Sequence, residues 1–235
     1  MSKYIFHWIT NLSEVPRSFG WFDFKSKAWK FPWRQWIDEV PKASEKLPGK
    51  LAEPEEYRVM VDETDLFLLK ELEKDAFTEF TEIAKALKMS PQGVRYRYYK
   101  HIKKHDLVAD YEIAILPYPL LVSDMCSVIV NFQNDRVLAK FSNTLSNKPF
   151  IFNYGKIVGR DSLLLHSYTP RTEVPSFLNA LNSMVRKNLV ADFSYVNFDV
   201  SSFKRQTVSS EFYEDGSWTF DLTEKRRSLS EIMRK

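Results

Sequence analysis

In the first half of the chain, hydrophobic residues recur at the spacing of three amphipathic helices. The first helix follows Asp62, a favoured helix cap, and the second covers about residues 79–87. The third covers about residues 91–104, because Ser90 is a favoured cap and Pro91 is tolerated at the first helical position. Only a short turn separates the second helix from the third, so the pattern predicts a helix-turn-helix.

The predicted third helix has a strongly cationic outward face. Residues 83–105 contain several lysines and arginines and no acidic residue, whereas the first helix is acidic. Val94, Tyr98 and Ile102 share one face, so the polar residues opposite them point outward. Such side chains bind phosphates and base edges, which makes double-stranded DNA the expected partner. The candidate DNA-binding residues are Ser90, Gln92, Arg95, Tyr96, Arg97, Tyr99, Lys100 and Lys103.

After residue 108 the pattern changes to strand, helix, strand, strand, helix, strand. The strands are expected at residues 127–132, 150–158, 162–168 and 193–200, and the helices at 136–145 and 173–185. This order is the ferredoxin-like βαββαβ arrangement. We therefore expect an α+β protein in which a winged helix-turn-helix domain precedes a ferredoxin-like domain.

Aromatic residues are dense at the N-terminus. Tyr4, Phe6 and Trp8 alternate with other residues as in a half-buried strand. Two aromatic clusters at residues 21–24 and 29–33 predict a hairpin, followed by a short helix to about Val40. Packing of these aromatics in the core is favoured over base stacking. Residues 41–60 hold three prolines and many charges, and predict a linker along the surface.

The N-terminal segment shares an aromatic register with the C-terminal tail. Trp29 aligns with Trp218, and the same offset aligns four more aromatic pairs, which are Phe31 with Phe220, Phe24 with Tyr213, Tyr4 with Phe193 and Phe6 with Tyr195. We interpret residues 1–36 as a partial repeat of the last strand and hairpin of the second domain. The final residues, TEKRRSLSEIMRK, are expected to form a charged end.

Composition narrows the class of protein without deciding it. A single cysteine, Cys126, excludes an internal disulfide and fits a reducing cytosol. No apolar run approaches the roughly 20 residues that span a bilayer, and the N-terminus lacks a signal-peptide pattern. We therefore expect a cytoplasmic protein without a membrane partner. The net charge of +3 is small, so the local cationic cluster carries the DNA argument.

The helix-turn-helix resembles that of the leucine-responsive and asparagine-type regulators (Lrp/AsnC), a largely prokaryotic and archaeal family. The matching residues are Val61, Asp62, Asp65, Asp75, Ile83, Ala84, Leu87, Ser90, Val94, Arg97, Leu107 and Val108. Asp106 stands where the family usually has glycine, and Ile102 lies one residue late, as if the third helix held an insertion. The βαββαβ pattern resembles the family's regulatory and oligomerisation domain, so the resemblance covers about residues 60–203.

The resemblance implies a sequence-specific DNA-binding transcription regulator that forms a homodimer or a higher even oligomer. It implies that a small effector binds near the turn holding Gly159 and Asp161, although these can equally be ordinary turn residues. The expected division is residues 1–40 for the aromatic segment, 41–60 for the linker, 61–112 for the winged helix-turn-helix, 113–203 for the ferredoxin-like domain, and 204–235 for the hairpin and charged tail.

The sequence gives little support for chemistry. His101 and His105 have a metal-binding spacing on one helix face, but no zincin pattern accompanies them, so we expect no metal, cofactor or catalytic residue. Two alternatives stay open. Haem-biosynthesis decarboxylases resemble this two-part architecture, and His166 would then be a substrate-binding residue. The basic helix would otherwise dock on an acidic protein partner in an oligomerising adaptor.

Overall fold

The structure, a computed structural model, divides the chain into two compact units. The sheet unit comprises residues 1–55 and 114–203, and the helical unit comprises residues 56–113 and 204–235. The described residues are 7, 9, 10, 12–15, 19–53, 61–108, 116–198, 213, 214, 217 and 218. The predicted strand of Tyr4 to Trp8, the wing after Val108 and the charged tail lie outside them. No helix in the described part is long and apolar enough to cross a membrane.

The sheet unit has the predicted βαββαβ order. Its elements are β4 (Ser123–Asn131), α5 (Asp135–Asn143), β5 (Ile151–Lys156), β6 (Ser162–Pro170), α6 (Val174–Arg186) and β7 (Asp192–Phe198). The strands are antiparallel neighbours in the order β5-β6-β4-β7, and β1 (Ser13–Glu14) adds to the outer edge of β5. This order, with the two crossover helices, is a ferredoxin-like fold, so the predicted fold class is confirmed.

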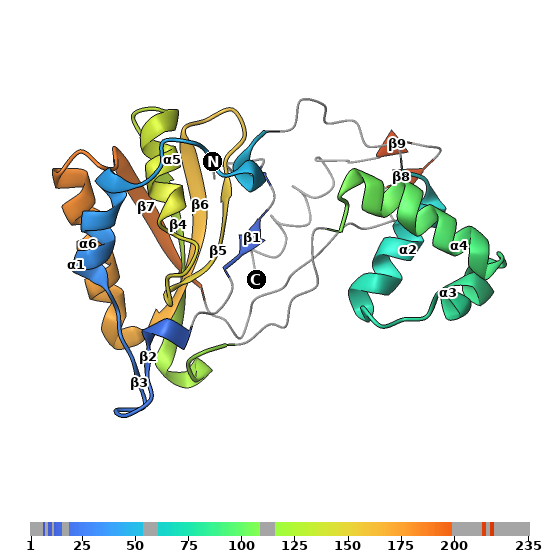
Figure 1. Cartoon of the computed structure of the whole chain (residues 1–235), viewed down its shortest axis with the longest axis horizontal. Helices are drawn as coiled ribbons and strands as arrows, with labels where there is room; N and C mark the ends of the chain where they lie inside the picture. Colours follow the sequence, from blue (N-terminus) through green and yellow to red (C-terminus); the bar gives the residue numbers. More distant parts are fainter. Residues whose placement is uncertain are drawn as a thin grey trace, which may run out of the picture. The chain divides into compact units, whose positions relative to one another are not determined.

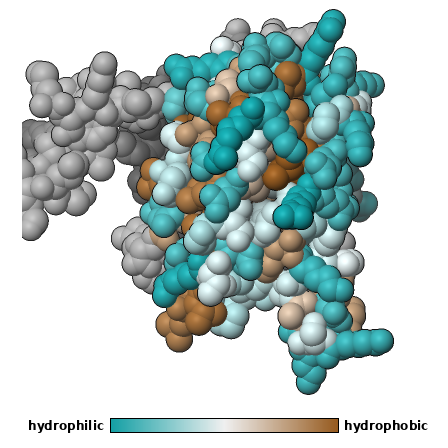
Figure 2. All heavy atoms as spheres, turned by 90° about the vertical axis from the view of Figure 1, so that its left-hand side faces the viewer, coloured by the Kyte–Doolittle hydropathy of each residue, from teal (hydrophilic) through white to brown (hydrophobic). Residues whose placement is uncertain are grey.

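The helices of this unit cover one face of the sheet (Figure 1). Successive side chains of a strand point to opposite faces of the sheet. The face toward the helices carries fully buried residues, which include Val128 and Val130 of β4 and Leu163 and Leu165 of β6. The helical stripe predicted around Phe177 packs on them. The outer surface beside α6 is largely hydrophilic, with smaller hydrophobic areas (Figure 2).

The N-terminal segment is an integral part of the sheet unit. It forms β2 (Phe22–Asp23), β3 (Ala28–Trp29), α1 (Trp33–Glu39) and the short 3-10 helices η1 (Phe19–Trp21), η2 (Val40–Lys42) and η3 (Gly49–Leu51). The hairpin and the helix lie where the sequence predicts them. Three tryptophan indole N–H groups tie the segment down, by donating to Asn147 O at 2.8 Å, Glu173 Oε2 at 2.8 Å and Thr144 Oγ1 at 2.9 Å.

Residues 41–53 differ from the predicted surface linker. Leu51 is fully buried in the core of the sheet unit, and Lys148 Nζ reaches Glu39 Oε2 just upstream at 2.6 Å. The proline and charge content that predicted a linker reflects the short 3-10 helices, since Pro41 and Pro48 lie at or beside their first positions. Two leucines among many polar residues, Leu47 and Leu51, both pack in this core and were the sequence's sign of burial.

The helical unit contains α2 (Glu63–Lys74), α3 (Phe80–Leu87) and α4 (Pro91–Arg97). α4 continues into η4 (Tyr98–Ile102), a π-helical turn, and η5 (Lys103–His105), a 3-10 turn. Its core consists of Leu68, Leu72, Ile83, Ala84, Val94 and Ile102. The three helices fall where the hydrophobic spacing places them, but Phe77 between α2 and α3 is almost fully exposed. A short hairpin of β8 (Tyr213–Glu214) and β9 (Ser217–Trp218) belongs to this unit, and not to the ferredoxin-like domain in which the sequence interpretation placed it.

We expect Trp36→Ala to destabilise the sheet unit by about 3–5 kcal/mol, because a fully buried indole leaves a cavity and Thr144 loses its donor. Phe24→Ala is the matched control: Phe24 lies in the same segment but is 72% exposed, so its loss should change stability by at most about 0.5 kcal/mol. Urea unfolding monitored by circular dichroism measures both. Equal losses would mean that α1 is not part of the core.

Candidate nucleic-acid interface

The turn between α3 and α4 is fixed by backbone geometry. Lys88 ends α3 in the left-handed region with a φ of 53°, and Met89 N donates to Ala84 O at 2.9 Å. Ser90 then caps α4, because its Oγ accepts from Gly93 N at 3.1 Å, and Pro91 takes the first helical position. The sequence predicts the short turn, the Ser90 cap and the place of Pro91, whereas the left-handed conformation of Lys88 is seen only in the structure.

The π-helical turn accounts for the position of Ile102, which lies one residue later than the family pattern places it. A π turn holds one more residue than an α turn, so it absorbs a single insertion without breaking the helix. Ile102 is fully buried beside Val94 as a result. Asp106 then ends the helix with a φ of 51°, a conformation that glycine adopts without strain. The two departures from the family pattern are thus local accommodations within the same fold.

A cationic and aromatic surface covers the outward side of this helix. We call it the α4 face, and it consists of Gln92, Arg95, Tyr96, Tyr99, Lys100 and Lys103, all of which are exposed. Tyr99 lies between two cations, with Arg95 Cζ 5.8 Å and Lys103 Nζ 5.6 Å from its ring centroid. Such cation–π pairing orients the long side chains without neutralising them, so their charge stays available to a polyanion.

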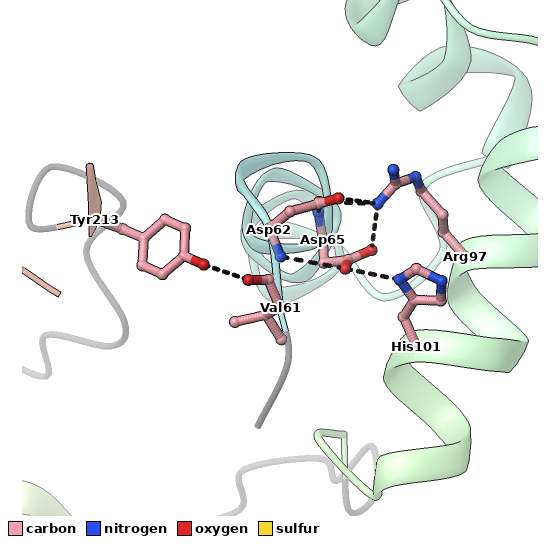
Figure 3. A network of polar contacts seen from close by, with 6 residues as sticks. All are labelled: Val61, Asp62, Asp65, Arg97, His101 and Tyr213. Carbon is pink, nitrogen blue, oxygen red and sulfur yellow. Dashed lines mark hydrogen bonds and ion pairs between the residues drawn. The ribbon is translucent and has the colours of Figure 1, made fainter. Parts of the chain in front are cut away.

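Arg97 is placed differently from the other candidates. Its Nη1 donates to Asp62 Oδ1 at 2.8 Å, to Asp62 Oδ2 at 2.7 Å and to Asp65 Oδ1 at 3.0 Å (Figure 3). Burial alone would raise the pKa of Asp62, but the hydrogen bonds from Arg97 and from Asp65 N outweigh it and lower the pKa. Arg97 therefore holds the helix against α2, and we leave it out of the proposed contact set.

Asp65 is the centre of this network. Its side chain is 1% exposed, and it forms a reciprocal capping box with Asp62 at the start of α2. His101 Nδ1 lies 2.9 Å from Asp65 Oδ2, so both Arg97 and His101 approach the same carboxylate (Figure 3). His101 is thus directed to Asp65. In the part of the chain that the structure describes, no group of three or more His, Cys, Asp or Glu could hold a metal ion.

The C-terminal hairpin contacts the chain just before the N-terminus of α2. Tyr213 is buried, and its hydroxyl donates to Val61 O, one residue before the capping aspartate (Figure 3). The hairpin thereby supports the helix that in turn holds Arg97 and His101. The sequence gives no sign of this contact, since Tyr213 and Val61 lie far apart in the chain. The role of Asp65 was visible in the capping pattern.

The turn with the candidate effector residues lies in the sheet unit. Gly159 has a φ of 72°, and its N–H donates to Glu53 Oε1 at 3.0 Å. Lys156 Nζ pairs with the same Glu53 carboxylate. Burial and a hydrogen bond with Asp135 raise the pKa of Asp161, whose carbonyl accepts from Phe132 N at 2.8 Å. Both candidate residues therefore have partners within the chain, and the turn already holds a carboxylate.

His166 and Cys126 occupy interior positions of the sheet. His166 Nδ1 lies 2.6 Å from Asn153 Oδ1, and burial lowers the pKa of the imidazole. Cys126 Sγ donates to Asn197 Oδ1 at 2.9 Å, and burial, together with Asp124, raises the pKa of its thiol to about 11. The thiolate population is accordingly small at neutral pH, which disfavours Cys126 as a nucleophile.

Comparison with known proteins identifies the helical unit. Residues 61–100 match the model of the AsnC-type helix-turn-helix domain. These residues form an AsnC-type helix-turn-helix domain. Over 61 residues the chain is 44% identical to the HTH-type transcriptional regulator LrpA of Pyrococcus horikoshii and 46% identical to that of Pyrococcus abyssi. Each match covers 26% of this chain and 43% of the relative, so the chain spans less than half the length of these curated relatives.

Solved structures of Lrp/AsnC regulators align with a larger part of the chain. Escherichia coli AsnC is 16% identical with a TM-score of 0.45, and the alignment covers 63% of this chain and 97% of that protein. Bacillus subtilis LrpC is 19% identical with a TM-score of 0.46, covering 62% and 99%. A Neisseria meningitidis transcriptional regulator, solved as a complex with L-Met, is 15% identical with a TM-score of 0.48, covering 64% and 97%.

We expect Arg97→Ala to destabilise the helical unit by about 2–3 kcal/mol, because it leaves the buried Asp65 carboxylate with His101 as its remaining partner from this helix. The loss should be smaller than for a fully buried ion pair, because Asp62, the other partner of Arg97, is half-exposed and its interaction is screened by water. Arg95→Ala, which removes an exposed arginine two residues away, should leave stability unchanged within about 0.5 kcal/mol. Hydrogen exchange of the α2 amides measures the stability of the helical unit directly.

The same substitution predicts a pH dependence. The pKa of Asp62 is lowered below 3.8 in the folded protein, so its contribution is complete above that pH and is lost as the pH falls through the folded value. The stability difference between the wild type and Arg97→Ala should therefore narrow in acid. A difference that stays constant to the lowest pH at which the protein folds would show that Asp62 contributes nothing.

Proposed function

We propose that this protein is a sequence-specific, DNA-binding transcription regulator of the Lrp/AsnC type. The observation that carries the proposal is the α4 face, where three exposed cations and two exposed tyrosines share one side of the second helix of a helix-turn-helix. The named function of the LrpA relatives supports it. Because those matches cover under half of each relative, the regulatory activity of the whole chain is part of the proposal.

We assign different roles to the side chains of the α4 face according to their positions along the helix. A helix of this size fits the major groove of B-form DNA, where its N-terminal residues reach base edges. Gln92 lies in the first turn of α4, so its amide is assigned to base readout. Lys100 and Lys103 lie about two and three turns later and are assigned to phosphates. Arg97 and Asp65 fix the orientation of the helix from behind.

DNA binding should be strongly salt-dependent. Each phosphate contact contributes about 0.9 to the slope of log affinity against log salt concentration, so the Lys100→Ala, Lys103→Ala double variant should reduce the slope by up to about 1.8. It should weaken binding to all duplexes alike, because phosphates carry no sequence information. Fluorescence anisotropy over a salt series with a selected duplex and a scrambled duplex provides the measurement.

The control for this experiment removes the same charge elsewhere in the unit. Lys70 and Lys74 lie on α2, and their replacement by alanine should leave the salt slope unchanged. Gln92→Ala should reduce the preference for the selected duplex while keeping the wild-type slope. Affinity that does not change with salt concentration, or equal effects of both lysine pairs, would contradict binding through the α4 face.

A homodimer is the second part of the proposal. A single helix-turn-helix gains affinity when two copies bind half-sites about one helical turn apart. In the described chain no strand pairs with the outer edge of β7, and this strand exposes Tyr195 (48%), Val196 (63%) and Phe198 (36%). Exposed apolar residues along an open strand edge favour pairing with another chain.

Val196→Asp should therefore convert the dimer to a monomer, because it places a charge in the middle of the apolar strand. Phe77→Asp introduces the same charge at an exposed apolar position of the helical unit and should leave the mass unchanged. Light scattering at micromolar concentration distinguishes the two states. A wild-type protein that is monomeric under these conditions would remove this part of the proposal and leave DNA binding untouched.

An effector is the third part, with Gly159 and Asp161 as its proposed site. The Gly159 N–H is already bound by the Glu53 carboxylate, so an amino-acid effector with a free carboxylate would have to compete with Glu53 for that donor and for Lys156. Effector binding near this turn would therefore be linked to release of residues just upstream of the helical unit.

A further inference from the structure

Two small hairpins in this chain share one construction. In the first, Phe22 lies opposite Trp29 and Asp23 opposite Ala28. In the second, Tyr213 lies opposite Trp218 and Glu214 opposite Ser217. Each thus pairs an aromatic residue with tryptophan and an acid with a small residue, and each places its tryptophan on the second strand. The second strands, β3 and β9, align at one sequence offset, the one that matches Trp29 with Trp218 and also matches the other aromatic pairs of the N-terminal and C-terminal segments.

The two hairpins differ only in their turns. Residues 24–27 form a four-residue turn in the first hairpin, whereas residues 215 and 216 separate the strands of the second. A two-residue difference at a turn is the kind of change that repeated segments tolerate, because turns are exposed and accept insertions. The cross-strand pairs are therefore equivalent once the longer turn is allowed for: Tyr213 matches Phe22 in the backbone register, and not Phe24 as the ungapped sequence alignment suggests.

The first hairpin docks on a rigid aromatic surface of the sheet unit. We call this the Tyr118 patch, and it consists of Tyr118, Met125, Phe152 and Tyr168. Trp29 lies edge-on to Tyr118, with ring centroids 5.8 Å apart. The patch is held without the hairpin, because Tyr118 Oη donates to Pro149 O at 3.3 Å and Tyr168 Oη donates to Tyr118 O at 2.8 Å.

The elements on either side of the first hairpin have their own anchors. Val15 N donates to Phe152 O at 2.9 Å before it, and the Trp36 indole is fully buried and bonded to Thr144 after it. Undoing the hairpin would therefore expose the part of the Tyr118 patch that Trp29 covers, while β1, α1 and Phe31, which also contacts Tyr118, stay in place. The patch is thus a preformed site for a tryptophan-containing hairpin, and in this structure the N-terminal hairpin of the same chain occupies it.

We propose that the Tyr118 patch accepts the C-terminal hairpin of a second copy of this chain, and that the N-terminal hairpin normally excludes it by filling the patch in cis. The matching cross-strand pairs carry the proposal, since Trp218 holds the same register position on the second strand of its hairpin as Trp29 holds in the first. Exchange of an equivalent element between copies is a low-cost route to assembly. The N-terminal segment then acts as a built-in cap that limits oligomer growth.

The test opens the N-terminal hairpin without touching its aromatic residues. Lys27 is exposed and has a φ of 52°, which proline cannot adopt because its ring holds φ near −65°. Lys27→Pro should therefore open the turn, whereas Lys27→Gly favours the positive φ and serves as the matched control. The probe is a labelled peptide of residues 209–222, and the same peptide carrying Trp218→Ala is its control.

We expect the peptide to bind Lys27→Pro at least about tenfold more tightly than the wild type or Lys27→Gly, because occupancy in cis reduces the competent fraction. The full-length Lys27→Pro variant should also show a larger mass than the wild type in light scattering, and adding Trp218→Ala should restore the wild-type mass. Phe22→Ser, which removes the aromatic partner of Trp29, should reproduce both results if the proline variant folds poorly.

Three results would overturn the proposal. Equal peptide affinity for Lys27→Pro and Lys27→Gly would show that the hairpin does not cover a binding site. Equal affinity for the two peptides would show that Trp218 does not determine docking. A mass of Lys27→Pro equal to that of the wild type, with both proteins folded, would show that copies do not exchange hairpins.

Discussion

A single buried carboxylate determines how the recognition helix is held. Asp65 is withdrawn from water, and a buried charge without partners costs several kcal/mol. Its two partners, the guanidinium of Arg97 and the imidazole of His101, both come from α4 and its continuation, so the carboxylate is satisfied only when that helix lies in one orientation. Hydrophobic packing around Val94 and Ile102 would permit some sliding, whereas three directional contacts do not. The orientation of the α4 face depends on this constraint.

The constraint also separates two roles within one basic helix. Composition alone treats every lysine and arginine between residues 83 and 105 as a candidate for the phosphate backbone. Arg97 shares the helix with Arg95, yet one guanidinium pairs with α2 and the other stays exposed. The difference follows from helical geometry, because residues two apart point to nearly opposite sides. Periodicity placed Arg97 beside the outward face, but only the acidic cap of α2 assigns it to the interior.

Local signals predicted most of the fold. The caps at Asp62 and Ser90, the short turn between the second and third helices and the βαββαβ order all follow from residues close together in the sequence. The structure departs from prediction where contacts are long-range. Leu51 is buried by strands a hundred residues away, and Glu53 reaches the turn at Gly159. No periodic pattern identifies a partner at that distance, so the predicted linker and the open effector turn could not be corrected from sequence.

The π-helical turn connects these arguments, because it shows how the helix tolerates an insertion inside its most constrained segment. An extra residue in a regular α-helix would rotate every later side chain by about 100° and move Ile102 out of the core. The π turn takes up that residue between Tyr98 and Ile102, so Val94 and Ile102 both stay buried. The side chains within it, Tyr99 and Lys100, lie on the α4 face. An extra residue at this place therefore changes the spacing of the outward residues of the α4 face while Val94 and Ile102 keep their buried positions.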